Sequence, residues 1–238
     1  MITIALAAAR HINRDIPHNL SQMERFMREA AEKGAQLVCF GEAFLQGFDC
    51  LDWNYETDQN MAIVIGGETF AHIRRLSKEI GIDVLFGFIE REGKTFYSSA
   101  ALIAGGHLHQ LYRRISQGWK EYWRTDNHYR EGSIVSVFTY RGKRFAIALC
   151  GDLWEYPERF SLGEDVLLWP VYINYTQQEW NSGESEEYAS QAQLACKTTL
   201  MVNTIADGDA YGGAFLFEEG KIAASLPMNK EGLLFIEI

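Results

Sequence analysis

The sequence predicts an α/β protein with enough strands for two sheets. The first observation is a β-α-β-α-β pattern that fills the chain before residue 90, followed by a strand-rich middle with glycine-containing turns. The second is composition: 47% of the 238 residues are hydrophobic and 23% are charged, as in globular proteins that bury a large core. The chain has no linker, repeat or low-complexity segment, so we expect a single domain over residues 1–238.

The N-terminal elements follow from hydrophobic spacing. Leu20, Met23 and Met27 recur at helical intervals, and Gly34 stands where a helix would end. Short apolar runs on either side of this helix have the length of buried strands. In order, the spacing predicts a strand at Ile2–Ala7, a helix through Leu20–Ala30 that ends at Gly34, a strand at Gln36–Phe40, a helix at Phe70–Ile80 and a strand at Ile82–Phe86.

The rest of the chain is predicted to be mainly strands separated by turns. Glycine pairs with a polar residue or with a second glycine at several turn positions, and an apolar run follows each of them. The expected strands are Phe86–Glu90, Thr95–Ile103, His107–Tyr112, Ile134–Tyr140, Arg144–Leu149, Val166–Val171, Leu200–Thr204, a pair around Glu219-Gly220 and Leu233–Ile238, with a helix over 184–198. The long loops at 46–60 and 116–130 are of the length that is typical of functional loops.

Charge and cysteine content exclude several classes. Lys and Arg total 22 against 32 for Asp and Glu, a net charge of −10, which disfavours binding to nucleic acid or to an anionic membrane. The four cysteines form no C-x-x-C pair, the N-terminus lacks the basic region of a signal peptide, and no apolar run is long enough to span a membrane. We therefore expect a cytoplasmic protein with reduced thiols.

Glu42 is the first candidate catalytic residue. It follows the predicted strand Gln36–Phe40 and precedes an aromatic-rich loop. Partial desolvation at such a position raises the pKa of a carboxylate, which suits a general base. The alternative is a loop glutamate that caps a helix or pairs with an arginine.

Cys150 is the second candidate. The predicted strand Arg144–Leu149 leads into Cys150 and a turn containing Gly151, an arrangement similar to a nucleophile elbow with backbone N–H groups free to bind an oxyanion. A thiol becomes a competent nucleophile when a neighbouring cation lowers its pKa from about 8.5. The alternative is an inert buried cysteine.

Lys120 is the cation that we expect beside this thiol. It lies in the segment Leu111–Trp123, which is dense in Arg, Lys, Glu and Trp. A base, a thiol and a cation together form a complete acyl-transfer set, although a basic surface turn is the alternative. His128 is a weaker candidate partner for the cysteine, and His107 and His109 form a possible metal pair that lacks a third ligand nearby in the sequence.

Several motifs, in order along the chain, together carry a family resemblance. They are Gly34–Glu42, Tyr112–Arg114, Cys150–Glu158, Asn203 and Gly212–Lys221. These segments resemble the motifs of the nitrilase superfamily of carbon–nitrogen hydrolases, and the resemblance extends over nearly the whole chain.

The resemblance implies a four-layer αββα sandwich of two mixed sheets flanked by helices, assembled as a homodimer or a higher homo-oligomer. It also implies an amidase-type hydrolase of a non-peptide C–N bond, which acts on a small amide or carbamoyl substrate with water, through a covalent thioester, and uses no metal or cofactor. Carried over to this sequence, Glu42 is the base and Cys150 is the nucleophile.

Two positions depart from the family pattern. The lysine of the family's Tyr-Arg-Lys segment is Arg114 here, and arginine cannot transfer a proton near neutral pH. We expect Lys120, six residues further on, to supply the cation, with Arg114 contributing beside it. The family's second glutamate is displaced: Glu121 is the nearest glutamate, whereas Asp126 is closer to the expected spacing from Cys150.

Substrate selectivity is expected from aromatic residues in the loops and from Asn203, which follows a predicted strand. The aromatic candidates are Phe44, Phe48, Trp119, Tyr122, Trp123 and Trp154. Trp154 could equally pack in a dimer interface. The change at position 114 leaves open a catalytically silent binding or complex-forming protein, and the same residues would also serve an acyltransferase that uses an amine in place of water.

Overall fold

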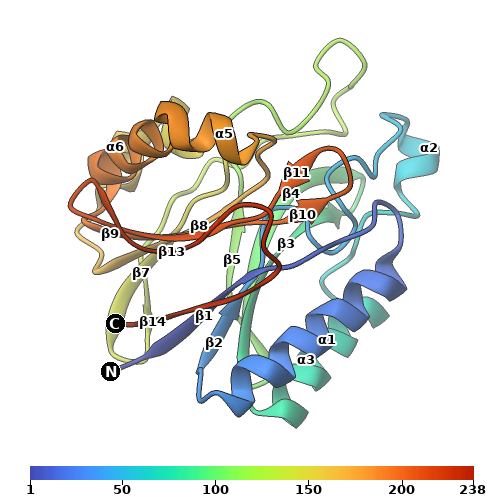
Figure 1. Cartoon of the computed structure of the whole chain (residues 1–238). Helices are drawn as coiled ribbons and strands as arrows, with labels where there is room; N and C mark the ends of the chain where they lie inside the picture. Colours follow the sequence, from blue (N-terminus) through green and yellow to red (C-terminus); the bar gives the residue numbers. More distant parts are fainter.

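The computed structural model describes residues 1–238 as two six-stranded sheets packed face to face, with helices on the outer sides (Figure 1). In spatial order, the first sheet contains β14 (Gly232–Glu237), β1 (Thr3–Ala8), β2 (Leu37–Cys39), β3 (Asp83–Glu92), β4 (Thr95–Ala104) and β5 (His107–Arg113). Neighbours among β1, β2 and β3 are parallel, and the other pairs are antiparallel, so the sheet is mixed.

The second sheet has the same number of strands and is also mixed. In spatial order, it contains β13 (Lys221–Leu226), β12 (Ala214–Glu218), β9 (Thr198–Asn203), β8 (Val166–Val171), β7 (Lys143–Ile147) and β6 (Phe138–Tyr140). β7, β8 and β9 pair in parallel, and the outer pairs are antiparallel.

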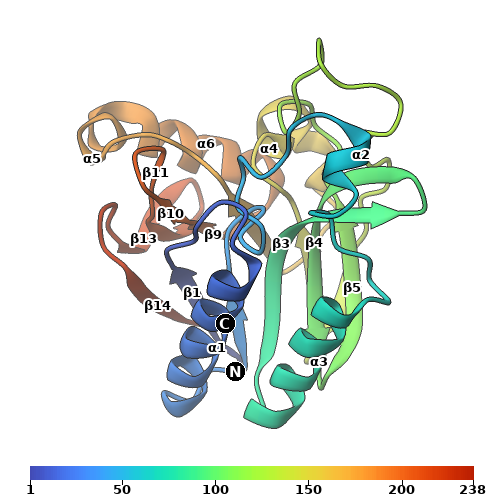
Figure 2. The same ribbon diagram turned by 90° about the vertical axis from the view of Figure 1, so that its right-hand side faces the viewer.

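Helices complete the outer layers. α1 (Ile16–Glu32) and α3 (Glu68–Ile80) cover the first sheet, and α6 (Ser185–Ala195) covers the second (Figures 1 and 2). The shorter elements are α2 (Tyr55–Asp58), α4 (Asp152–Glu155), the 3₁₀ helix η1 (Pro157–Phe160), α5 (Gln177–Glu179), the π-helical segment η2 (Trp180–Glu184) and the ribbon of β10 (Ile205–Ala206) with β11 (Ala210–Tyr211). This four-layer arrangement confirms the predicted fold class.

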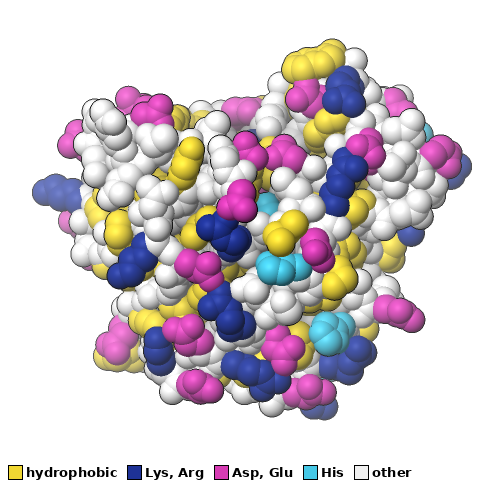
Figure 3. All heavy atoms as spheres, turned by 45° about the vertical axis from the view of Figure 1, so that its right-hand side comes forward, with side chains coloured by type: hydrophobic (Ala, Val, Ile, Leu, Met, Phe, Trp, Pro, Cys, Tyr) yellow, Lys and Arg dark blue, Asp and Glu magenta, His cyan; other side chains and the backbone are white.

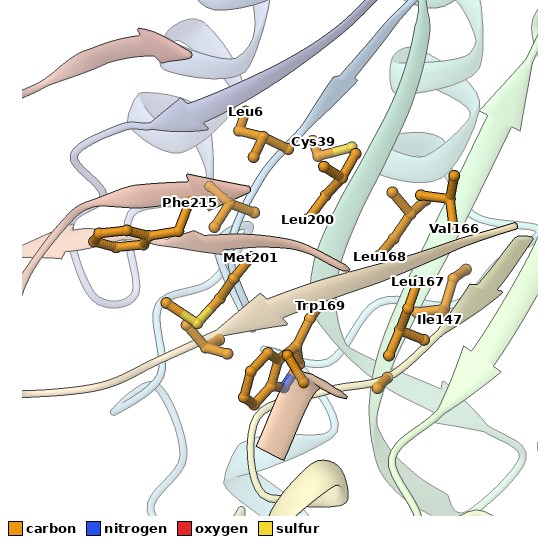
Figure 4. Close-up of a cluster of buried hydrophobic side chains, with 14 of the residues drawn as sticks. Leu6, Cys39, Ile147, Val166, Leu167, Leu168, Trp169, Leu200, Met201 and Phe215 are labelled. Atoms are coloured by element: carbon orange, nitrogen blue, oxygen red, sulfur yellow. The ribbon is translucent and has the colours of Figure 1, made fainter. Parts of the chain in front are cut away.

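Alternation along the strands separates the layers of the core. In Figure 4, Leu168 and Leu200 of the second sheet point toward Leu6 and Cys39 of the first, and all four belong to the larger buried cluster. Trp169 points to the other side of β8, where it stacks on Tyr188 of α6. Successive side chains of a strand face opposite sides of its sheet, so each sheet contributes to two hydrophobic layers.

Three predicted elements differ from the structure. The two strands predicted on either side of Phe86 form one continuous β3. The strand predicted at Ile134–Tyr140 is reduced to β6, because the residues before Phe138 pair with no strand and Ile134 is 74% exposed. The predicted helix over 184–198 ends at Ala195, since Thr198 already belongs to β9.

The surface carries charges of both signs. On the face shown in Figure 3, acidic and basic side chains are interspersed. The long connection between β5 and β6 protrudes at the upper right of Figure 1. None of the helices combines the length and the apolar character that are needed to cross a membrane.

Candidate active site

Glu42 lies in the turn that follows β2, with its side chain fully buried. Ala43 beside it has a φ of +50°, a strained conformation of the kind that clusters at functional sites. A Cβ on Gly87 of β3 would lie 2.5 Å from the Ala43 nitrogen and 2.7 Å from the Glu42 Cα. Only glycine fits there, so Gly87 is a residue that the sequence analysis missed, although a glycine within an apolar strand is a signal of close backbone approach.

Cys150 occupies the turn between β7 and α4, and its φ of +41° shows that the predicted sharp turn is present. Its N–H donates to the carbonyl of Pro170 at 3.0 Å, and its carbonyl accepts from the Trp169 indole at 2.9 Å. The thiol Sγ lies 3.5 Å from the carbonyl oxygen of Tyr172. The backbone of the turn is therefore fixed by β8, and the N–H of Gly151 is left with no acceptor in the chain.

Arg114 is the cation that contacts Glu42. Its Nη1 donates to both carboxylate oxygens, at 3.0 and 3.2 Å, and the Ser98 hydroxyl donates to Oε1 at 2.8 Å. The guanidinium is held on its other sides by Ser116 Oγ, 2.8 Å from Nε, and by the Gln117 carbonyl, 2.6 Å from Nη2. Every nitrogen of the guanidinium therefore has an acceptor within the buried site.

The electrostatics leave the cysteine as a neutral thiol in the free protein. Burial, followed by the charge of Glu42, raises the pKa of Cys150 to about 12, and the opposing charge of Arg114 only reduces this shift. A neighbouring cation does lower the thiol pKa as expected, but burial and Glu42 outweigh it, so the net shift is upward. Glu42 lies close enough to the thiol for its charge to raise the thiol pKa, so a base is available to remove the proton when a substrate arrives.

Asp152 connects the two halves of the site, and the sequence analysis gave it no role. It is fully buried in the first turn of α4. Its Oδ1 accepts from the backbone N–H groups of Ile115 and Ser116 at 3.1 and 2.8 Å. Its Oδ2 accepts from the Leu149 N–H at 2.8 Å and from the Tyr112 hydroxyl at 2.6 Å. One carboxylate thus holds the segment just after β5, which carries Arg114, against the turn that carries the cysteine.

Lys120 does not take the position that we expected. Its Nζ donates to the Tyr129 carbonyl at 2.5 Å and pairs with Glu131 at 3.1 Å, within its own loop. Glu42 has Arg114 as its ion-pair partner. The expectation is corrected because the end of β5 points the nearer cation inward, whereas the loop beyond it closes on itself.

Neither candidate for the second acidic residue hydrogen-bonds to the base or to the thiol. The side chain of Asp126 is 63% exposed, and it accepts from the N–H and the ring of His128. Glu121 makes no hydrogen bond to Glu42 or Cys150, and its Oε2 is buried without a partner. The acidic side chain that does lie next to the nucleophile turn is Asp152.

The six predicted pocket aromatics have different surroundings. Phe48 stacks on Tyr172, with ring centres 4.3 Å apart, next to the carbonyl that contacts the thiol. Trp119 is buried near Ala43 with its indole N–H unpartnered. In contrast, Trp123 is 82% exposed. The remaining three are Phe44, fully buried behind the Glu42 turn; Tyr122, whose hydroxyl donates to Glu131; and Trp154, 38% exposed on α4, where it packs edge-on against Tyr188.

Asn203, at the end of β9, is committed to the backbone. Its Nδ2 donates to the carbonyls of Ile173 and Gly212, both at 3.0 Å, and its Oδ1 accepts from the Ile173 N–H at 3.1 Å. It therefore holds the segment after β8, which includes Tyr172, and substrate binding by Asn203 stays a prediction.

Two of the three histidines considered in the sequence analysis, His109 and His128, have other partners. The His109 ring hydrogen-bonds to the Thr139 carbonyl at 2.9 Å, and His128 stacks on Tyr55. No three His, Cys, Asp or Glu side chains come together in a group that could hold a metal ion.

Comparison with known proteins agrees with this architecture. The sequence profile of the carbon-nitrogen hydrolase family matches residues 3–238, so the chain belongs to this family. An amidase from Nesterenkonia sp. has the same fold, with a TM-score of 0.80 and 19% identity over 100% of this chain and 90% of that one. A glutamine-dependent NAD+ synthetase from Acinetobacter baumannii is also similar, with a TM-score of 0.78 and 22% identity over 98% of this chain and 45% of that one.

The curated relatives match this chain over only part of their own length. An N-carbamoylputrescine amidase from Solanum tuberosum is 27% identical over 69% of this chain and 57% of its own length. A nitrilase from Pyrococcus abyssi is 26% identical over 65% of this chain and 59% of its own. The matched region is thus less than two thirds of either relative.

Proposed function

We propose that this chain hydrolyses the C–N bond of a small amide or carbamoyl compound, with Cys150 as nucleophile, Glu42 as general base and Arg114 as the stabilising cation. The observation that carries the proposal is the buried ion pair of Arg114 and Glu42 beside the Cys150 thiol. Membership of the carbon-nitrogen hydrolase family and the amidase names of several relatives support the reaction class.

The first half-reaction forms a thioester. Glu42 takes the thiol proton as Sγ attacks the carbonyl carbon, and the resulting oxyanion is stabilised by the Gly151 N–H and by the charge of Arg114. The C–N bond then breaks, and the proton on Glu42 passes to the departing amine. The acyl group remains on Cys150.

The second half-reaction reverses these roles. Glu42 removes a proton from water, the hydroxide attacks the thioester carbon, and the Sγ leaves with the proton that Glu42 returns. Arginine stays charged near neutral pH, so Arg114 contributes charge and position but transfers no proton. In this scheme Glu42 alone carries protons in both halves.

A second candidate function is binding without hydrolysis. It is favoured by the saturation of Arg114, whose three nitrogens all have acceptors, and by the raised pKa of Cys150. Acyl transfer to an amine is a variant of the first proposal, and product analysis with an added amine separates it from hydrolysis.

We also propose that the protein is a homodimer or a higher homo-oligomer that acts in the cytoplasm. Trp154 and Leu194, 38% and 60% exposed on α4 and α6, are available for such an interface. All four cysteines are free thiols, as is typical of a reducing compartment. Light scattering of the purified protein, with Trp154→Ala and Leu194→Ser as interface variants, tests the oligomeric state.

The test of the enzymatic proposal is release of ammonia or amine from a panel of small amides, carbamoyl compounds and nitriles. We expect the wild type to turn over at least one amide or carbamoyl member, and Cys150→Ala to lose about 10³-fold or more in rate. Cys50→Ala is the matched control for loss of a thiol and should retain activity. Turnover by Cys150→Ala would contradict the proposed nucleophile, and an inactive wild type across the panel would favour the binding function.

A further inference from the structure

The backbone conformation at position 151 does not require glycine. It lies between Cys150 and the first residue of α4, with φ −63° and ψ −10°, a right-handed conformation open to every L-residue. The reason for glycine at this position must therefore be the lack of room for a side chain.

The space is taken by Arg114. A Cβ on Gly151 would lie 2.6 Å from the Arg114 Nη2, 3.2 Å from the Ser116 Oγ and 3.5 Å from the Gln117 carbonyl oxygen. The first distance is too short for any carbon–nitrogen contact, so either the new methyl group or the guanidinium would have to move.

The guanidinium has little freedom to move. Nη2 donates to Gln117 at 2.6 Å, Nε donates to Ser116 at 2.8 Å and Nη1 donates to Glu42. Because the guanidinium is planar and rigid, displacing Nη2 rotates all three nitrogens together. A methyl group at position 151 would meet Nη2, and by rotating the guanidinium it would also disturb the contact of Nη1 with Glu42.

We infer that Gly151 is a positioning residue for Arg114: the absence of a side chain at position 151 lets this site use an arginine as its cation. A lysine at position 114 has no second terminal nitrogen and requires no such space. The residues at positions 114 and 151 are therefore sterically coupled. In this chain, an arginine at 114 is combined with a glycine at 151. The role in turnover rests on the proposed function, whereas the steric coupling does not.

The test is a double-mutant cycle of wild type, Gly151→Ala, Arg114→Lys and the double variant. Alanine keeps the backbone N–H at position 151, so the Gly151→Ala step changes only the space beside residue 114. The substrate-free readout is the rate of Cys150 alkylation by iodoacetamide from pH 7 to 10, resolved by peptide mass spectrometry. Thermal unfolding of each variant reports whether it is folded.

With arginine at 114, Gly151→Ala should move the positive charge away from the thiol and slow alkylation about tenfold at a given pH. With lysine at 114, the same change should alter the rate by less than about twofold. Gly66→Ala is the matched control, since a Cβ there meets nothing within 4 Å, and it should leave the rate unchanged.

An equal effect of Gly151→Ala in both backgrounds, or none with arginine at 114, would overturn the inference. If a substrate is found, kcat should follow the same pattern, with Arg114→Lys/Gly151→Ala more active than Gly151→Ala alone. If no amide is hydrolysed, the alkylation cycle still decides the inference, so its failure is distinct from failure of the proposed function.

Discussion

The end of β5 and the loop that follows it carry the same kind of charge but use it differently. Arg114, at the first of these, is buried and is bound to Glu42, Ser116 and the Gln117 carbonyl. Lys120, only a few residues on, is bound to Tyr129 and Glu131 of its own loop.

The difference comes from anchoring. Asp152 fixes the backbone at Ile115 and Ser116, so Arg114 just before them is held with its side chain against Glu42. The loop beyond Gln117 makes no hydrogen bond to the turn of Cys150, and Lys120 pairs with Glu131 of the same loop. In this site, the role of a cationic residue depends more on how its backbone is anchored than on whether the residue is lysine or arginine.

The largest effect that we predict is the difference between removing Arg114 and removing Lys120. Arg114→Gln leaves the buried Glu42 charge without a partner and should lower the free energy of unfolding by about 3–5 kcal/mol. Activity should fall below detection. Lys120→Met removes a pair whose side chains are 7% and 26% exposed, together with the hydrogen bond to the Tyr129 carbonyl; because Glu131 keeps some contact with solvent, we expect a smaller loss of about 1–3 kcal/mol. Urea unfolding measures both, and equal losses for the two variants would contradict the comparison.

A smaller effect is expected at the carboxylate that anchors the end of β5. Asp152→Asn replaces one acceptor oxygen with a donor and faces the Leu149 N–H with it. An unpaired buried N–H costs about 1–3 kcal/mol, and loosening of the Arg114 backbone should reduce kcat more than it changes KM. The control is Asp126→Asn, in the exposed loop. If Asp152→Asn kept the wild-type kcat, its role in positioning Arg114 would be refuted.

The smallest effect concerns the aromatic residues. Phe48→Leu loses its stacked contact with Tyr172 and with it an aromatic surface beside the thiol. A substrate packed on this surface loses a contact of about 0.5–1.5 kcal/mol, so KM should rise by up to about tenfold. Trp123→Leu, in the protruding loop, should change neither KM nor kcat. Steady-state kinetics on the best amide measures this pair, and a larger KM change for Trp123→Leu would place substrate against the loop instead.

The fold could be predicted from local patterns, and the site only in part. Helical spacing of Leu20, Met23 and Met27, and apolar runs such as Val166–Val171, reflect contacts that recur along one element. The strand predicted from Ile134 is too long because, in the sequence, an apolar residue in an exposed loop cannot be distinguished from one in a buried strand.

The roles of Gly87, Asp152 and Gly151 could not be read from the sequence because each depends on a segment far along the chain. Gly87 is explained by the Glu42 turn, Asp152 by the end of β5 and Gly151 by the Arg114 side chain. The choice between Arg114 and Lys120 failed for the same reason: spacing shows that both are near the site, but not which side chain points inward.

The most direct test of the account is the pH dependence of Cys150 alkylation in wild type, Glu42→Gln, Arg114→Gln and Lys120→Met. Burial and the charge of Glu42 raise the pKa of Cys150, to about 12, and Arg114 opposes them. Wild-type alkylation should therefore be slow at pH 7 and should still be rising at pH 10. Glu42→Gln should lower the pKa and speed alkylation at a given pH, Arg114→Gln should raise the pKa and slow alkylation, and Lys120→Met should match the wild type. A shift caused by Lys120→Met, with none from Arg114→Gln, would contradict the assignment of Arg114 as the cation of the site.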